Sequence, residues 1–284
     1  MKKLGLLMML LLLSRIALFC QAQTAGIEEK EVLRNEDVIF HQIDEHTWFG
    51  TGHLMANESL YLVEGETKAI LIDAGTKIKD LDKLVASITD KPVTLVATHV
   101  HPDHIGGNHF FDEVYMSPYD MPYVEMFTAP ENLDKRPVVH PVREGNVIDL
   151  GGLHVEVYEL PGHTPGELCL LLVEEQILFP GDGINHHLWM QLEGCSSLEE
   201  YAKSLERLDF LKKKAKYILH GHTRELENII LFDMVEQGIG ELLNQTDQEV
   251  TKCDDAYHWF GGIAKIHVYA PDGSAICYQE NHIS

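Results

Sequence analysis

Basic side chains are scarce in this 284-residue chain, where 22 Lys and Arg face 45 Asp and Glu. Residues 1–22 hold three of the basic residues and no acid, so the rest of the chain carries 19 basic and 45 acidic residues, a net charge of −26. A surface this negative repels phosphate backbones and anionic lipid. We therefore expect no nucleic-acid partner, and we interpret the acidity as a source of solubility.

Long uninterrupted apolar runs are also lacking. The longest, residues 4–13, follows two lysines and is soon broken by Arg15, so it is a poor match to a membrane span of about 20 residues. It is typical of a signal peptide over residues 1–22 with cleavage after Ala22, which predicts an exported protein, periplasmic or secreted. Acylation of Cys20 to give a lipoprotein is the less favoured alternative, because a bulky residue precedes it.

Cysteines are few, and the predicted cleavage leaves four of them. Export permits disulfides, but the sequence does not define a pairing. Cys169 lies in an apolar run and is expected to be buried in a strand, while Cys195 has no evident partner. Cys253 and Cys277 share one C-terminal segment, where a bridge and two free thiols are both open.

Internal repeats and low-complexity linkers are absent, which predicts one domain over residues 23–284 with a core at about 38–222. Short Val-, Ile- and Leu-rich runs alternate with segments of helical period, a pattern typical of layered α/β folds. Strands are expected at 60–63, 69–72, 93–97, 154–160, 168–179 and 217–219. Helices are expected at 76–89, after a capping box at Ser197 and Glu200, and at 225–245. The C-terminal helix and hairpin are placed within 225–279, and residues 116–144 are expected to form a long loop over a pocket.

The chemistry of the chain is concentrated in residues 98–107, which read Thr-His-Val-His-Pro-Asp-His-Ile-Gly-Gly. Three imidazoles and one carboxylate follow a buried strand directly, and these groups suit zinc, or iron and manganese when oxygen donors share the site. His99 and His101 point the same way from an extended turn, while Asp103 and His104 open the next helix and face a second position. The spacing therefore predicts two metal ions.

Further polar residues follow other predicted strands. His163 lies in a turn bracketed by Gly and Pro, Asp182 occupies a similar turn, and His220 and His222 follow the strand at 217–219. Side chains at the carboxyl ends of strands assemble the sites of open α/β sheets. Each residue alone is a weak signal, but together they predict one site.

The order and spacing of these motifs resemble the metallo-β-lactamase superfamily of binuclear metallohydrolases over about residues 38–222. The resemblance implies a four-layer αββα sandwich, extended here by a C-terminal β-hairpin. It assigns His99, His101 and His163 to a first metal ion and Asp103, His104 and His222 to a second. The same resemblance places Asp182 between both ions and Asp73 behind the metal-binding loop, which it would orient. His220 is expected to be structural.

The resemblance also implies hydrolysis by a hydroxide that bridges two divalent metal ions, most simply Zn²⁺, with Fe or Mn permitted. Asp103, beside that nucleophile, would act catalytically by accepting its proton and returning it to the leaving group. The expected substrate is a small molecule. An aspartate at position 182 resembles branches that cleave esters, lactones and thioesters, and no Lys and Arg cluster suited to glutathione is evident.

Three alternatives remain open at this stage. A β-lactam hydrolase fits the same ligand set, a non-heme iron oxidoreductase on the same fold fits the donor types, and a non-catalytic metal-binding protein would leave most of the set without a purpose. Substrate-pocket candidates are Trp48, Tyr119, His187 and Trp189, of which His187 or a loop tyrosine would serve as an oxyanion donor.

Overall fold

A computed structural model describes residues 30–52, 57–244, 250–252 and 264–283. The predicted signal peptide at 1–22 and Cys253 lie outside these ranges. Across the ranges given, no helix is long and apolar enough to cross a membrane.

The N-terminal half forms an eight-stranded sheet in sequential order, antiparallel from β1 to β5 and parallel from β5 to β8. Its strands are β1 (Lys30–Arg34), β2 (Val38–Gln42), β3 (Thr47–Gly52), β4 (Ser59–Glu64), β5 (Ala69–Ile72), β6 (Val93–Val96), β7 (Glu113–Met116) and β8 (Val138–Pro141). The predicted strands at 60–63, 69–72 and 93–97 correspond to β4, β5 and β6. β5 is buried along its whole length, as expected for a strand covered on both faces.

A second sheet of six strands has the order β15-β14-β12-β11-β10-β9. Its strands are β9 (Val147–Asp149), β10 (His154–Glu159), β11 (Leu168–Leu172), β12 (Ile177–Phe179), β14 (Tyr217–Ile218) and β15 (Glu227–Asn228). The parallel pair β12 and β14 is joined through a helix, as a parallel connection requires. The predictions at 154–160, 168–179 and 217–219 match this sheet.

The chain ends in a third sheet of order β13-β18-β17-β16, formed by β13 (His187–Met190), β16 (Val250–Lys252), β17 (Lys265–Val268) and β18 (Ala275–Tyr278). The predicted terminal hairpin is present as the antiparallel pair β17 and β18. It is part of a larger unit, because β13 pairs in parallel with β18 from almost ninety residues earlier in the chain.

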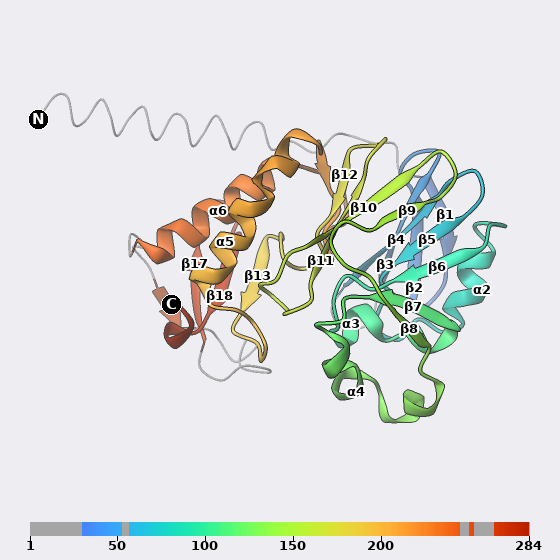
Figure 1. The fold of residues 1–284 in the computed structure, drawn as a ribbon, viewed down its shortest axis with the longest axis horizontal. Coiled ribbons are helices and arrows are strands. Elements are labelled where there is room, and N and C mark those ends of the chain that lie inside the picture. Colours follow the sequence, from blue (N-terminus) through green and yellow to red (C-terminus); the bar gives the residue numbers. More distant parts are fainter. Residues whose placement is uncertain (1–29, 53–56, 245–249, 253–263, 284) are drawn as a thin grey trace, which may run out of the picture.

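The helices lie on the outer faces of the two large sheets (Figure 1). They are α2 (Leu81–Ala86), α3 (Pro102–Ile105), α4 (Val124–Phe127), α5 (Leu198–Leu208) and α6 (Ile230–Leu243). α5 begins at the predicted capping box, in which Ser197 accepts from the backbone N–H of Glu200. α2 covers the first sheet, and α5 and α6 cover the second, which gives the four-layer αββα sandwich expected from the resemblance.

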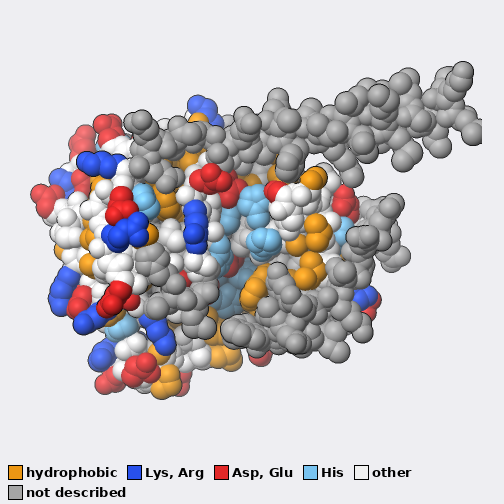
Figure 2. Space-filling model, turned by 180° about the vertical axis from the view of Figure 1, so that it is seen from behind, with side chains coloured by type: hydrophobic (Ala, Val, Ile, Leu, Met, Phe, Trp, Pro, Cys, Tyr) orange, Lys and Arg blue, Asp and Glu red, His pale blue; other side chains and the backbone are white. Residues whose placement is uncertain are grey.

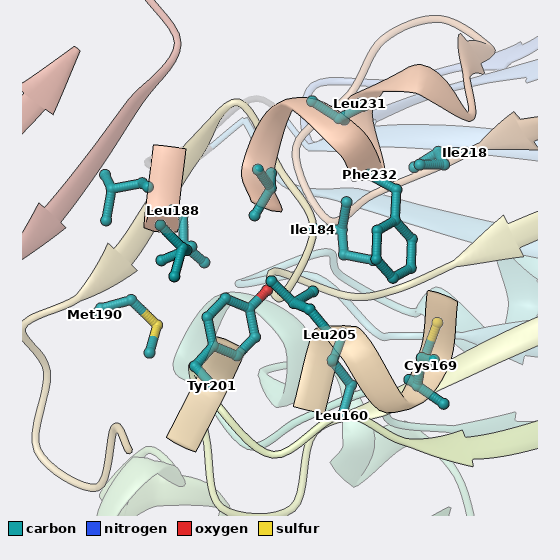
Figure 3. Close-up of a cluster of buried hydrophobic side chains, with 14 of the residues drawn as sticks. Leu160, Cys169, Ile184, Leu188, Met190, Tyr201, Leu205, Ile218, Leu231 and Phe232 are labelled. Carbon is teal, nitrogen blue, oxygen red and sulfur yellow. The ribbon is translucent and has the colours of Figure 1, made fainter. Parts of the chain in front are cut away.

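Three hydrophobic clusters hold the layers together. One fills the space between the two sheets and includes Val63 and Leu170. A second lies between the first sheet and α2. The third joins the second sheet to α5 and α6, and Figure 3 shows Tyr201, Leu205 and Phe232 meeting there. The loops at one end of both sheets are therefore held by packed cores on both sides.

Several predicted bounds need correction. The helix expected at 76–89 is shortened to α2, which ends at Ala86. It starts only at Leu81, because Asp80 has a φ of 52° and lies outside the right-handed helical region. The helix expected from residue 225 begins at Ile230, since the preceding β15 pairs with β14. The supposed loop at 116–144 contains α4, the 3₁₀ helices Met121–Tyr123 and Pro130–Lys135, and β8.

Candidate metal centre

Polar side chains from both large sheets meet at the loops that follow their strands. Figure 2 shows histidines gathered in the middle of one face, with acidic side chains beside them. The structure brings together all seven residues that the sequence assigns to metal ions, in the groups His99, His101 and His163, then His99, His104 and Asp182, then Asp103, His104 and His222. In each group, one ligand atom per residue lies within 4.8 Å of the others.

The first group is built from the loop after β6 and the loop after β10. Nε2 of His163 lies 3.0 Å from Nδ1 of His101. The other ring nitrogen of His163, Nδ1, donates to the backbone carbonyl of Trp189 at 2.7 Å, so Nε2 is the atom left for a ligand. His99 completes the group, with its ring edge-to-face to that of His163 and the two ring centroids 5.1 Å apart.

The second group combines α3 with the loop after β14. Nε2 of His104 lies 3.7 Å from a carboxylate oxygen of Asp103, and Nε2 of His222 lies 3.6 Å from the same oxygen. Proline at the first position of α3 suits a helix start, so the local sequence dictates where Asp103 and His104 emerge.

Asp182 lies between the two groups. One of its oxygens, Oδ2, is 3.0 Å from Nε2 of His222, 3.7 Å from His104 and 3.8 Å from His163. This close approach requires glycine at position 221, because a Cβ there would lie 2.2 Å from the other oxygen of Asp182.

Three polar atoms at the meeting point have no hydrogen-bond partner although they are buried. They are Nε2 of His99, Nε2 of His104 and Oδ1 of Asp182. An unpaired buried polar group costs about 1–3 kcal/mol, and it is therefore rare in native proteins. Imidazole nitrogens and a carboxylate oxygen that converge without partners are the donor set of a zinc, iron or manganese site, so the residues fit the metal ions that the sequence predicts.

Asp73 supports this loop from behind. One oxygen accepts from Nδ1 of His104 at 2.8 Å, and the other accepts from the backbone N–H of Thr98 at 2.7 Å. Because Nδ1 of His104 carries that proton, its Nε2 is free to face the cluster. Asp73 has a φ of 62°, which is uncommon outside glycine, and this strained backbone directs its side chain under the loop.

The local electrostatics differ between the two groups: burial favours neutral imidazoles in the first, whereas carboxylates favour the charged imidazole of His104 in the second. Burial lowers the pKa of His99 and of His101 well below the usual value, and neighbouring imidazoles add to the effect. Burial opposes charge on His104 as well, but the carboxylates of Asp103, Asp182 and Asp73 outweigh it and raise its pKa. The pKa of Asp182 is held well below its usual value, because His222 and His104 outweigh its burial.

Two buried acids that the sequence analysis missed hold the loops in register. Glu167 accepts from the backbone N–H groups of Asp182 and Gly183 at 2.7 and 2.9 Å, and burial raises its pKa well above the usual value. Asp120 accepts from the backbone N–H groups of Val100 and Gly166, and so ties the loop after β6 to the loop after β10. An acid directly before the wholly apolar strand β11 was the available signal for Glu167.

The four predicted pocket residues have different surroundings. Trp48 packs in the core on the α2 side of the first sheet, whereas the next residue, Phe49, faces the space between the sheets, because successive strand residues face opposite ways. Tyr119 is half exposed under the guanidinium of Arg143. His187 is exposed at the start of β13, and the half-buried Trp189 side chain packs against Ala264. Phe127 also lies at the cluster, with its ring centroid 5.2 Å from that of His101.

Comparison with known proteins bears on this site. The family model described as "Metallo-beta-lactamase superfamily" matches residues 57–222, which contain all seven residues of the cluster. An acyl-coenzyme A thioesterase, MBLAC2 of Gallus gallus, is 30% identical over 198 residues, which are 58% of this chain and 72% of that protein. An atrochrysone carboxyl ACP thioesterase of Aspergillus fumigatus is 28% identical over 173 residues, 60% of this chain and 51% of that protein.

A solved structure titled as a metallo-β-lactamase from Pontibacter korlensis matches the fold with a TM-score of 0.61, at 21% identity, over 72% of this chain and 99% of that one. That likeness concerns the fold. The family model, in contrast, spans more than half of the sequence, and the polar residues at its strand ends converge as described above. The chain therefore belongs to the metallo-β-lactamase superfamily.

Proposed function

We propose that this protein is a hydrolase that uses two divalent metal ions, most simply zinc, to cleave a thioester or a related ester or lactone. The observation that carries the proposal is the position of Asp182, whose oxygen lies within 3.8 Å of ligand atoms from both metal groups. A carboxylate between two sets of imidazoles suits a pair of ions held close together.

When bound, the metal ions would lower the pKa of water and polarise the substrate carbonyl. The protein supplies the alignment of that chemistry. Asp73 and the carbonyl of Trp189 set the ring orientations of His104 and His163. Glu167 holds the backbone of Asp182, so the central carboxylate is fixed before substrate arrives.

Asp103 is the acid placed to move a proton. Its side chain is 23% exposed, whereas that of Asp182 is 11% exposed. It therefore borders both the cluster and the solvent side from which a substrate enters. We assign it the role of accepting the proton of the attacking water and delivering it to the leaving group.

Two relatives support a thioester in particular, because both are named as thioesterases and each matches more than half of this chain. A thiolate leaves more readily than an alkoxide or an amide nitrogen, so a thioester places the smallest demand on the acid that protonates the leaving group.

The test combines metal analysis with turnover. Elemental mass spectrometry of the purified protein is expected to find about two zinc ions per chain, and an acyl thioester is expected to be cleaved faster than a lactone or a chromogenic β-lactam. Preferred cleavage of the β-lactam would mean that the substrate is a β-lactam and not a thioester, ester or lactone. Iron in place of zinc, without hydrolysis, would favour an oxidoreductase, and bound zinc without any turnover would favour a binding protein.

We also propose export, on the basis of the N-terminal segment alone. Residues 1–22 combine two lysines, an apolar run and a small-residue cleavage site. Mass spectrometry of the protein recovered outside the cytoplasm is expected to show a new N-terminus at Gln23. A full-length chain retained in the cytoplasm would contradict export, and a lipid-modified Cys20 would convert it to membrane anchoring.

A further inference from the structure

A second group of histidine and carboxylate lies beside the metal cluster. It consists of His186, which follows β12, His220, which follows β14, and Glu227 of β15. The two oxygens of Glu227 lie 2.6 Å from Nε2 of His186 and 3.0 Å from Nε2 of His220. Burial disfavours charge on Glu227, but the two histidines outweigh it and hold its pKa well below the usual value.

This group has the composition of a metal site but not its bonding. None of its side-chain atoms is among the buried polar atoms that lack a partner, whereas the metal cluster contributes three such atoms. Both ring nitrogens of His186 have partners, namely Glu227 and the hydroxyl of Ser274. We therefore interpret the group as a hydrogen-bonded connection and not as a further ion site.

One side of the connection ends at a metal ligand. The backbone N–H of His222 donates to Nδ1 of His220 at 3.2 Å. Because Nδ1 accepts that bond, the proton of His220 is on Nε2, which donates to Glu227. Glu227 thus determines the tautomer and orientation of His220, and His220 in turn holds the main chain of His222. The hydroxyl of Thr223, the next residue, also donates to Glu227 at 2.7 Å.

The other side ends in the C-terminal sheet. Nδ1 of His186 lies 2.6 Å from the hydroxyl of Ser274, and this hydroxyl donates to Asp272 at 2.6 Å. Both residues belong to the turn between β17 and β18, and the backbone N–H of Ala275 donates to the carbonyl of His186 at 2.7 Å. The turn is therefore joined to His222 through His186, Glu227 and His220 in succession.

We propose that Glu227 is a positioning residue for the second metal ion. Through His220 it holds His222 in its orientation toward Asp182, and the turn at 272–274 anchors Glu227 through His186. This inference rests on the proposed metal-dependent function. It gives the C-terminal sheet a role in metal affinity, although none of that sheet's side chains belongs to the predicted ligand set.

The central test is Glu227→Gln in the full chain, with zinc binding measured by competition against a chromogenic chelator. Glutamine keeps the size of the side chain but offers one acceptor oxygen, so one of the two histidines loses its acceptor. Loss of a group that orients a metal ligand typically weakens affinity 10–100-fold. We expect a weakening of about that size for the second zinc ion, with the first ion, bound by His99, His101 and His163, retained.

A matched control is Glu241→Gln. Glu241 of α6 bonds to Nε2 of the buried His267 of β17 at 3.0 Å, so it is also a glutamate-to-histidine pair that anchors the C-terminal sheet. Glu241 lies near the C-terminal end of α6, outside the loops that carry the predicted metal ligands. The control is expected to leave both zinc affinities unchanged. An equal loss in both variants would overturn the proposal, because it would indicate general loosening of the sheet.

A double-variant cycle separates positioning from folding. In the variant His220→Asn, the shorter side chain keeps an oxygen that can accept from the backbone N–H of His222. It is too short to donate to Glu227. In that background, Glu227→Gln is expected to cause no further loss of zinc affinity, and an additive loss would refute the coupling.

If Glu227→Gln does not fold, Ser274→Ala provides the test, with a smaller loss expected for the second ion only. Wild-type protein that binds no metal would refute the proposed function, whereas two ions bound equally by wild type and variants would refute this inference alone.

Discussion

The metal cluster and the group around Glu227 are built from the same side-chain types and lie at the same edge of the sheets, but their polar atoms end differently. In the metal cluster, Nε2 of His99, Nε2 of His104 and Oδ1 of Asp182 converge without hydrogen-bond partners. Around Glu227, the carboxylate oxygens and the histidine nitrogens facing them all have hydrogen-bond partners, and these bonds continue to the turn between β17 and β18.

This difference separates two uses of histidine that a sequence motif does not distinguish. A histidine whose ring nitrogens are both bonded to groups outside the metal cluster is held in place by the protein and is not available to an ion. A histidine that donates one nitrogen to a fixed acceptor and leaves the other unpaired is prepared as a ligand. His220 and His104 fall on opposite sides of this division, because both ring nitrogens of His220 are bonded whereas Nε2 of His104 is unpaired.

The largest expected effect comes from Asp182→Ala, which removes the carboxylate common to both metal groups. We expect hydrolysis to fall by more than the roughly 100-fold upper range for loss of an orienting partner, together with impaired metal binding, while circular dichroism shows a retained fold. Asp90→Ala, at an exposed site, serves as the control. Normal turnover with two ions bound would show that the cluster does not work as described.

Metal removal tests whether the unpaired atoms are ligands. An ion that binds only the folded state at 100 times its dissociation constant adds about 2.7 kcal/mol to the free energy of unfolding. For a chain of this length we expect zinc to raise the melting temperature by roughly 5–10 °C, and a chelator to reverse the change. A melting temperature that does not respond to zinc or chelator would remove the distinction between the two groups.

Asp73→Asn sharpens the comparison within the metal cluster. Asparagine tolerates the positive φ at this position, so the backbone should be kept while the ionised acceptor of His104 is lost. We expect the affinity for the second zinc ion to fall about 10–100-fold, measured by chelator competition. An unchanged affinity would mean that His104 is oriented by its packing alone.

The smallest expected effect concerns Cys195, whose thiol donates to the carbonyl of His163 at 3.1 Å. Burial raises its pKa to about 12, so the reactive thiolate is nearly absent at pH 8. Iodoacetamide is expected to label Cys195 slowly in the folded protein and rapidly after denaturation, as followed by mass spectrometry. Fast labelling of the folded protein would suggest that loose packing, rather than a metal requirement, leaves the atoms of the cluster unpaired.

Much of the site was predictable because its signals are local. The spacing from His99 to His104 and the turns around His163 and Asp182 are each readable within a few residues, and strand ends in α/β folds converge. Glu167 and Asp120 were missed because their partners are backbone N–H groups from other loops, which no short motif records. The connection from His220 to Glu227 was missed for a similar reason.

The fold shows the same division between local and long-range causes. The capping box at Ser197 and Glu200 predicts the start of α5 correctly, because both residues act within one helical turn. The pairing of β13 with β18 joins segments almost ninety residues apart, and no periodicity in either segment indicates its partner. The late start of α2 reflects the backbone of Asp80, which hydrophobic spacing alone does not reveal.

The ligand groups also draw on both halves of the sandwich. His99, His101, Asp103 and His104 follow a strand of the first sheet, whereas His163, Asp182 and His222 follow strands of the second. Any bound ion would therefore cross-link the two sheets, and its affinity would depend on the distance between them. The packing of the core between the sheets, at Val63 and Leu170, therefore sets the separation of the two halves of the site. A small expansion of that core would weaken metal binding well before the chain unfolds.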